Sequence, residues 1–347
     1  MTFPANVYLL AIGAAFLAAT LSSPFWQRWC WRSGLVDEPG ARKIHDRPLP
    51  LSGGLTVLTG MFVPTLLACL WLWIYPGGPS QAAQGIVEKS PPGRSHALLD
   101  STSRGLLAHG LNRRALELAG ILAGAAGMLL LGLLDDRHEL GAGAKFAGQV
   151  LVALLVAAAG VRITLFVPSI VFSFTITVLW ILTVINAFNF MDNMNGLCTG
   201  LGAIGAWNFA VISSAEGQYL VALLAFLAFG ALIGFLPYNF PKARAFLGDS
   251  GSHLVGYLLA VLAILPHFYT SYHPRRLAVF APLLVLGVPL LDLAWVVIIR
   301  WRLGKPFYQG DTNHLSHRLV RLGLSPLRTV LLIWLAAAAV GGLAVLG

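Results

Sequence analysis

The chain has 347 residues, of which 57% are hydrophobic and only 11% are charged. Soluble domains carry about a quarter charged residues, so this composition excludes an ordinary water-facing surface and predicts a membrane protein. The net charge is +9, but no basic tract stands apart from the apolar segments, so we expect no nucleic-acid partner.

Apolar runs of about 20 residues cross the hydrocarbon core as helices, because lipid offers no partner for backbone polar groups. Ten runs of roughly this kind predict an all-α, polytopic bundle in the lipid bilayer, with a single transmembrane domain over residues 1–347. The predicted spans are Val7 to Trp26, Gly53 to Tyr75, Ala115 to Leu134, Phe146 to Val161, Ile170 to Phe188, Leu197 to Ile212, Tyr219 to Pro237, Gly251 to Phe268, Leu277 to Ile299, and Leu327 to Leu346. The connection at 76–114 is rich in Pro, Gly, Ser and Ala, so we expect a mobile outer loop there.

The basic residues in the connections predict the orientation of the bundle. Of the 23 Lys and Arg residues, 15 fall on one side, which is therefore expected to be cytoplasmic. An even number of helices then places both termini outside the cytoplasm. Nine of the 14 acidic residues also fall on the cytoplasmic side, which the positive-inside rule does not require. Acids and bases gathered at one face favour a site for a polyanion with a divalent metal ion.

Two cytoplasmic motifs in the first half of the chain carry opposite charges. Arg42, Lys43 and His45 lie close to prolines in the first connection, where clustered cations either bind phosphate or anchor the chain at the membrane surface. Asp135 and Asp136 end the third predicted helix, where two adjacent carboxylates oppose the helix dipole. This arrangement favours a metal or cationic partner over a solvated acidic helix end.

Polar residues also follow the fifth and seventh predicted helices. Asn186, Asn189 and Asp192 share one face if this segment is helical, which indicates a hydrogen-bonding pocket or, alternatively, a polar turn. Asp249 stands at the start of the next helix, where a carboxylate can hold Mg²⁺ against an anion bound at the helix N-terminus. The alternative for Asp249 is a simple N-cap.

The last cytoplasmic connection contains two histidines and an arginine. His314 and His317 share a face if the segment is helical, and Arg318 follows directly. No Cys or Glu at helical spacing completes a zinc ligand set, so contacts to a phosphate or a base are favoured over a metal site.

Taken in chain order, these motifs resemble those of the polyprenyl-phosphate N-acetylhexosamine-1-phosphate transferase family, glycosyltransferase family 4, over nearly the whole sequence. The matching blocks are Arg42-Lys43-x-His45 with Pro48, Pro50, Gly53 and Gly54; Asp135-Asp136; Asn186-Ala187-x-Asn189-x-x-Asp192; Gly248-Asp249-x-Gly251-Ser252; Pro289-x-x-Asp292; and Asp311-x-x-His314-x-x-His317-Arg318-Leu319. The chain departs from the family at Asn195, where an Asp is usual, and at Ser316, where a His is usual. Either departure is expected to alter donor choice or metal affinity, or to mark an inactive relative.

The resemblance implies that a UDP-N-acetylhexosamine, with UDP-N-acetylglucosamine as the expected donor, gives its sugar-1-phosphate to undecaprenyl phosphate and releases UMP. It implies Mg²⁺ as the cofactor, with Mn²⁺ as an alternative, and an active site at the cytoplasmic face of a bacterial inner membrane. Asp249 is then the principal metal ligand with Asp192 assisting, while Asp135 and Asp136 orient the acceptor phosphate or the metal. Contacts to phosphate, sugar or nucleotide are expected from Arg42, Lys43, His45, Asn186, Asn189, His314, His317 and Arg318. Such a bundle is also compatible with a homodimer.

Three alternatives stay open at this point. The related phospho-N-acetylmuramoyl-pentapeptide transferase has a different first-loop pattern, Gly-Thr-Pro-Thr-Met-Gly-Gly, and is the nearest alternative. A transporter of an anionic solute would also be polytopic, but transporters place their coupling residues near the bilayer midplane and often in repeated halves. An inactive relative is the third alternative, which an activity measurement would exclude.

Overall fold

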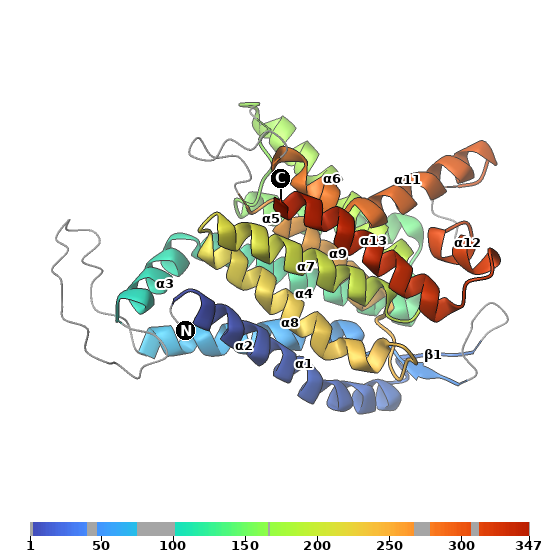
Figure 1. The fold of residues 1–347 in the computed structure, drawn as a ribbon, viewed down its shortest axis with the longest axis horizontal. Coiled ribbons are helices and arrows are strands. Elements are labelled where there is room, and N and C mark those ends of the chain that lie inside the picture. The colour runs from blue at the N-terminus through green and yellow to red at the C-terminus, as the bar shows by residue number, and fades with distance from the viewer. Residues whose placement is uncertain are drawn as a thin grey trace.

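A computed structural model of the chain describes residues 3–39, 47–74, 101–165, 167–266, 278–306 and 312–346. The fold is a helical bundle with one two-stranded antiparallel sheet (Figure 1). The elements are α1 (Ala5–Ser33), β1 (Val36–Asp37), β2 (Leu49–Pro50), α2 (Gly53–Ile74), α3 (Ser101–Arg113), α4 (Ala115–His138), α5 (Ala142–Ala158), α6 (Ile170–Met191), α7 (Leu197–Ala215), α8 (Tyr219–Asn239), α9 (Gly248–Leu262), η2 (Ala278–Phe280), α10 (Ala281–Val285), α11 (Gly287–Arg302), α12 (Leu315–Arg321) and α13 (Pro326–Leu346).

The apolar helices confirm a multi-pass membrane bundle. Among the described residues, seven helices are long and apolar enough to cross a bilayer, namely α1, α2, α4, α6, α7, α8 and α13. Helix α5 is apolar but has 17 residues, and α9 has 15. Large apolar side chains such as Leu21, Trp73 and Leu335 are exposed, as expected where a helix faces lipid rather than water.

The predicted ninth span differs from the structure, because the chain forms two helices there. Helix α10 ends at Val285 and α11 begins at Gly287. Pro289 lies four residues after Val285 and has no N–H to donate to the Val285 carbonyl, with which its ring would also clash. The proline therefore breaks the predicted continuous helix.

The connection that we expected to be a loop contains a helix at its end. Residues 101–113 form α3, which then leads directly into α4. Residues 75–100, which make up most of the connection, lie outside the described part of the chain. The expectation of an irregular outer segment is therefore wrong for 101–113.

Helix α9 is the centre of the bundle. Of its 15 residues, 13 are buried, and it packs against α2, α4, α6 and α7. Two glycines allow the close approach of its N-terminus to its neighbours. A Cβ atom added at Gly54 would lie 2.7 Å from the carbonyl carbon of Ser250, and one added at Gly132 would lie 2.3 Å from the Cα of Ser250. Side chains at these positions would separate α2 and α4 from the first turn of α9.

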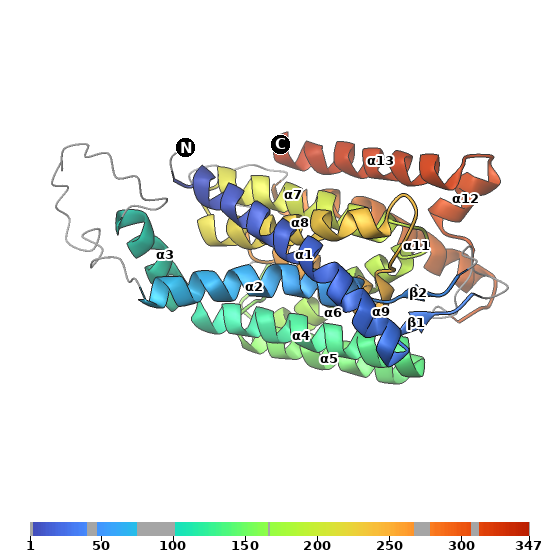
Figure 2. The ribbon, with the colours of Figure 1, turned by 90° about the horizontal axis from the view of Figure 1, so that it is seen from below.

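The two ends of the bundle carry different elements. Figure 2 shows β1, β2 and α12 at one end, while α3 and the N-terminus lie toward the other. Helix α13 begins next to α12 and runs back toward the end that carries the N-terminus. Both termini are therefore directed toward the same end, and their placement outside the cytoplasm stays a prediction.

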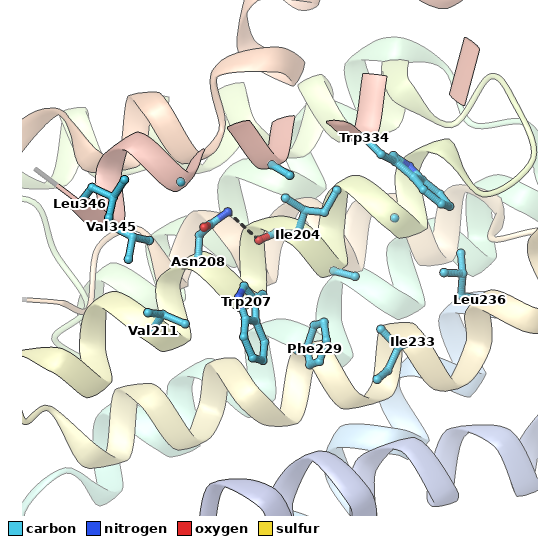
Figure 3. A pocket seen from close by; sticks show the side chains of 14 residues that line it. Ile204, Trp207, Asn208, Val211, Phe229, Ile233, Leu236, Trp334, Val345 and Leu346 are labelled. Carbon is cyan, nitrogen blue, oxygen red and sulfur yellow. Dashed lines mark hydrogen bonds between the residues drawn. The ribbon is translucent and has the colours of Figure 1, made fainter. Parts of the chain in front are cut away.

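An apolar groove of about 670 Å³ lies between α7, α8 and α13 (Figure 3). Trp207, Phe229 and Trp334 line it together with aliphatic side chains. The amide of Asn208 also lies there, but its Nδ2 donates to the carbonyl of Ile204 one turn earlier in α7 at 3.0 Å. This groove contains none of the acidic residues discussed below, and its hydrocarbon lining suits lipid chains rather than a charged substrate.

Candidate active site

Four carboxylates from three helices come together where α4 ends and α9 begins. We call Asp135, Asp136, Asp192 and Asp249 the acid cluster. Asp135 and Asp136 lie in the last turn of α4, Asp249 lies in the first turn of α9, and Asp192 follows the last residue of α6. The structure thus brings together the four acids that the sequence predicted as catalytic.

Asp136 holds the N-terminus of α9. Its Oδ1 accepts a hydrogen bond of 2.7 Å from the backbone N–H of Asp249, and its Oδ2 accepts one of 3.0 Å from that of Ser250. The carboxylate therefore acts as a cap supplied by α4, so the alternative of Asp249 as the N-cap is wrong. It also occupies two of the N–H groups that we expected an anionic ligand to use.

Asp135 has a different partner, which the sequence analysis did not select. The ammonium Nζ of Lys145 lies 2.6 Å from Oδ2 of Asp135 and 3.5 Å from Oδ2 of Asp249. The other oxygen of Asp135, Oδ1, accepts the N–H of Leu140 at 2.9 Å. Lys145 comes from the first turns of α5 and places one positive charge between two carboxylates.

Helix α6 supplies an amide and a carboxylate to the same place. The Nδ2 of Asn189 donates to Oδ1 of Asp249 and, at 3.0 Å, to Oγ of Ser252. Burial and the nearby carboxylates of Asp249 and Asp136 raise the pKa of Asp192 well above its usual value. An acidic group in this environment needs either a proton or a cation, so the cluster is suited to bind a positive ion.

Asn186 lies one turn before Asn189 but serves another purpose. Its Nδ2 donates to Oε1 of Gln149 at 2.9 Å and to the carbonyl of Leu182 at 2.8 Å. The bond to Gln149 ties α6 to α5, whereas the bond to Leu182 lies within α6. The structure therefore does not bring Asn186 into the acid cluster with Asn189 and Asp192.

A group of three side chains could hold a metal ion. One ligand atom from each of Asp135, Asp249 and His253 lies within 4.8 Å of the other two. His253 follows Asp249 by one helical turn on α9 and was not selected from the sequence. Asp192, which we expected to share the ion with Asp249, is not part of this group of three.

A second polar group surrounds His314 at the start of α12. The Nδ1 of His314 lies 2.7 Å from Oδ2 of Asp292, and Oδ1 of Asp292 accepts the N–H of Leu315 at 2.6 Å. The His314 ring also contacts the ring of Phe190 edge-on, at 5.4 Å between centroids. Phe190 follows Asn189, so this contact joins the histidine segment to the acid cluster.

The two remaining predicted residues of the last connection are less enclosed. The ring of His317 lies 6.4 Å from that of His314, between centroids. Arg318 is exposed, and its Cζ lies 4.8 Å above the ring of Trp295. Both residues therefore lie on the helix that carries the His314 segment, as the sequence predicted.

The residues that depart from the family pattern lie outside the acid cluster. Asn195 is exposed, and its Nδ2 donates to the carbonyl of Pro241 at 3.3 Å. Ser316 is buried, and its hydroxyl donates to Oδ1 of Asn193 at 2.6 Å. The serine therefore connects α12 to the turn that carries Asp192.

The first connection is described only at its two ends. Arg42, Lys43 and His45 lie outside the described residues. The flanking strands β1 and β2 pair with each other, and the N–H of Phe246 donates to the carbonyl of Pro50 at 3.0 Å. In return, the N–H of Gly53 donates to the carbonyl of Phe246 at 3.0 Å. These bonds fix the end of the connection against the segment that leads to Asp249.

Known proteins with similar sequences identify the family. The family model described as Glycosyl transferase family 4 matches residues 118–267, which include most of α4 and all of α5 to α9. The chain is 30% identical over 339 residues to a probable undecaprenyl-phosphate N-acetylglucosaminyl 1-phosphate transferase of Bacillus subtilis (strain 168), covering 94% of this chain and 82% of the relative. It is 31% identical over 330 residues to a decaprenyl-phosphate N-acetylglucosaminephosphotransferase of Mycobacterium tuberculosis (strain CDC 1551 / Oshkosh), covering 88% and 73%. It is 26% identical over 347 residues to the undecaprenyl-phosphate alpha-N-acetylglucosaminyl 1-phosphate transferase of Escherichia coli (strain K12), covering 95% and 81%. The chain therefore belongs to the polyprenyl-phosphate N-acetylhexosamine-1-phosphate transferases of glycosyl transferase family 4.

Proposed function

We propose that this chain transfers an N-acetylhexosamine-1-phosphate, with N-acetylglucosamine as the expected sugar, from its UDP derivative to undecaprenyl phosphate and releases UMP. The product begins a lipid-linked intermediate of the cell wall or of a surface glycan such as lipopolysaccharide or teichoic acid. The observation that carries the proposal is the acid cluster with Lys145, located at one end of an apolar bundle in a member of this family. The names of the relatives support the same reaction.

The two substrates reach the site from different phases, the bilayer and the water. The lipid acceptor lies in the bilayer with its phosphate at the interface, whereas the nucleotide sugar arrives from water. The acid cluster lies where α4 and α6 end and α9 begins, beyond the apolar stretches of these helices. We assign this end to the cytoplasmic face of a bacterial inner membrane, because the connections of this side carry 15 of the 23 basic residues.

The donor atoms of the acid cluster fit Mg²⁺, with Mn²⁺ as an alternative. Carboxylate oxygens are the ligands that Mg²⁺ prefers, and burial together with the nearby carboxylates of Asp249 and Asp136 raises the pKa of Asp192, so a bound cation would stabilise its ionised form. Asp249 is the principal ligand in this proposal, with Asp192 and Asp135 as further donors. When bound, the ion neutralises charge on the pyrophosphate and orients it.

The chain's own residues then position the substrates. The Nδ2 of Asn189 holds the carboxylate of Asp249 by donating one hydrogen bond to it, while Asp136 fixes the first turn of α9. Asp292 orients the ring of His314 and leaves Nε2 for a phosphate or the nucleotide. Arg42, Lys43, His45, His317 and Arg318 are expected to contact phosphates or the nucleotide.

We expect direct in-line attack by the acceptor phosphate on the sugar-bearing phosphorus. The second pKa of a phosphate monoester is about 6, so the acceptor is already largely dianionic at neutral pH and needs little help from a general base. The covalent alternative uses Asp135 or Asp136 as the nucleophile. Asp136 accepts two backbone hydrogen bonds, and Asp135 is engaged by Lys145 and by the N–H of Leu140, which favours positioning roles for both.

The test is product analysis with the full-length protein purified in detergent. Protein, Mg²⁺ and polyprenyl phosphate are mixed with UDP-N-acetylglucosamine, UDP-N-acetylgalactosamine, UDP-glucose or UDP-N-acetylmuramoyl-pentapeptide, and lipid-linked products are identified by mass. Asp249→Asn protein prepared in parallel controls for contaminating enzymes. We expect a UDP-N-acetylhexosamine to react and UDP-glucose to be rejected by roughly 10⁴-fold, because the missing acetamido group leaves polar groups of the site unpaired.

Each of the other outcomes has a definite meaning. Exclusive use of the pentapeptide donor would assign the chain to the alternative branch, and no product with any donor would favour an inactive relative or a transporter. Omission of polyprenyl phosphate tests the mechanism. Direct attack predicts no burst of UMP without acceptor, whereas stoichiometric UMP release with labelled protein would establish the covalent route.

A further inference from the structure

His253 is a buried histidine whose hydrogen-bonding capacity is not used. Its side chain is 0% exposed, and neither ring nitrogen has a hydrogen-bond partner among the residues that the structure describes. Buried polar groups are nearly always paired, so a histidine with both ring nitrogens unpaired needs an explanation, such as a catalytic role or a bound water or ion. His253 lies in α9 one turn after Asp249, and helical side chains lean toward the N-terminus of their helix. The ring is therefore directed toward the acid cluster.

Two carboxylates complete a set of donors around this ring. Ligand atoms of Asp135, Asp249 and His253 lie within 4.8 Å of one another. In the structure, the Nζ of Lys145 lies 2.6 Å from Asp135 and 3.5 Å from Asp249, so a positive charge already occupies the space between the carboxylates. An ammonium can satisfy the two carboxylates, but it leaves His253 unpaired. A metal ion would engage all three side chains.

We propose that Asp135, Asp249 and His253 form a mixed oxygen and nitrogen metal site, in which the imidazole makes a first-row transition metal ion such as Mn²⁺ bind more tightly than the Mg²⁺ that the carboxylates alone would accept. Mg²⁺ takes oxygen ligands, whereas imidazole nitrogen suits the later divalent metals, whose affinity for such sites rises from Mn²⁺ through Co²⁺. Three protein ligands leave coordination positions open for phosphate oxygens or water. The inference rests on the proposed function for the use of the ion, but the selectivity itself is a property of the resting protein.

The test measures metal binding without substrates, so it does not depend on transfer. Full-length protein in detergent is stripped with a chelator and titrated with Mn²⁺, and free Mn²⁺ is followed by electron paramagnetic resonance. Mg²⁺ affinity is obtained by competition. Pulsed spectroscopy of the bound Mn²⁺ then reports whether a nitrogen nucleus is directly coordinated. We expect one Mn²⁺ per chain with a coordinated nitrogen, and a higher affinity for Mn²⁺ than for Mg²⁺.

The decisive variant is His253→Gln, which keeps a polar side chain but removes the imidazole. We expect it to lose the nitrogen signal and at least about tenfold in Mn²⁺ affinity, with a smaller change for Mg²⁺. His314→Gln is the matched control and should retain the nitrogen signal, because Nδ1 of His314 is engaged by Asp292. If the variant fails to fold, the presence or absence of a coordinated nitrogen on Mn²⁺ bound to the wild-type protein still tests the site.

Three results would overturn the proposal. They are the absence of tight Mn²⁺ binding, a bound Mn²⁺ without a coordinated nitrogen in the wild-type protein, and a nitrogen signal that persists in His253→Gln. A failure of the proposed transfer reaction would look different. In that case Mn²⁺ would bind with a nitrogen ligand, but no UDP-sugar would yield a lipid-linked product with either Mg²⁺ or Mn²⁺.

Discussion

The substitution Asp136→Asn separates a positioning carboxylate from a metal-binding one. The asparagine carbonyl can accept one of the two N–H groups at the start of α9, but its amide NH₂ then faces the other. One bond to a charged acceptor, with a contribution of about 1.5–3 kcal/mol, is lost, and the remaining bond becomes neutral and weaker by about 1 kcal/mol. We therefore expect a loss of roughly 3 kcal/mol in the free energy of unfolding.

The same change displaces Asp249 without altering its charge. A loss of roughly 3 kcal/mol corresponds to a fall in Tm of about 5 °C for a chain of this size. Misplacement of a reacting group by about 1 Å costs up to about a hundredfold in rate, so transfer should fall by about 10- to 100-fold. Asp249→Asn should show the opposite pattern. It keeps both N–H bonds to Asp136 and hence most of the stability, but transfer should fall by more than about a hundredfold because a charged ligand is lost.

Both variants are compared in detergent by thermal unfolding and by the yield of lipid-linked product. The transfer by Asp136→Asn should lie between that of the wild-type protein and that of Asp249→Asn, whereas its Tm should lie below both. If Asp136→Asn kept its Tm within about a degree and abolished transfer as completely as Asp249→Asn, the positioning role would be refuted. Asp136 would then act directly on the metal or the substrate.

Three further predictions concern residues around the acid cluster. Asn195→Asp should change transfer by no more than about twofold, because Asn195 is exposed and bonded to the carbonyl of Pro241, and a large loss in the same product assay would contradict this placement. Lys145→Met should tighten substrate-free Mn²⁺ binding by about tenfold, because it removes a cation that competes for two carboxylates, while transfer falls. Unchanged Mn²⁺ affinity would show that the ammonium and the metal occupy different places. Asp292→Ala should lower transfer by at least about tenfold by releasing the ring of His314, and normal turnover would argue against a role for this histidine.

Much of the fold could be predicted from the lengths of the apolar runs. The predicted spans beginning at Gly53, Ala115, Ile170, Leu197 and Tyr219 start where α2, α4, α6, α7 and α8 begin. These positions could be predicted because a helix in lipid must start and end near the change from apolar to polar residues. The break before α11 was missed because hydropathy does not register the hydrogen bond that a proline removes.

The site was predicted only in part, because its contacts depend on which helices are neighbours. The acids and Asn189 were found because polar residues are conspicuous in so apolar a chain. Lys145 was counted only as a residue of the basic cytoplasmic side, since nothing in its local sequence indicates that α5 packs beside α4. His253 follows Asp249 by four residues, a helical spacing that could have indicated a shared site. It was missed because it falls within the predicted span from Gly251 to Phe268 and not in a polar connection.

The pair Asp135 and Asp136 illustrates what a sequence motif leaves unspecified. Consecutive residues of an α-helix point about 100° apart, so two adjacent carboxylates cannot both face the same partner. In this fold one faces α5 and contacts Lys145, while the other faces α9 and accepts its first N–H groups. The repulsion between them, which in the sequence favoured a metal or cationic partner, is relieved by two separate positive partners, an ammonium and a helix N-terminus. The motif therefore places one acid in the group of three side chains that could hold a metal ion and uses its neighbour to hold the helix that carries Asp249 and His253.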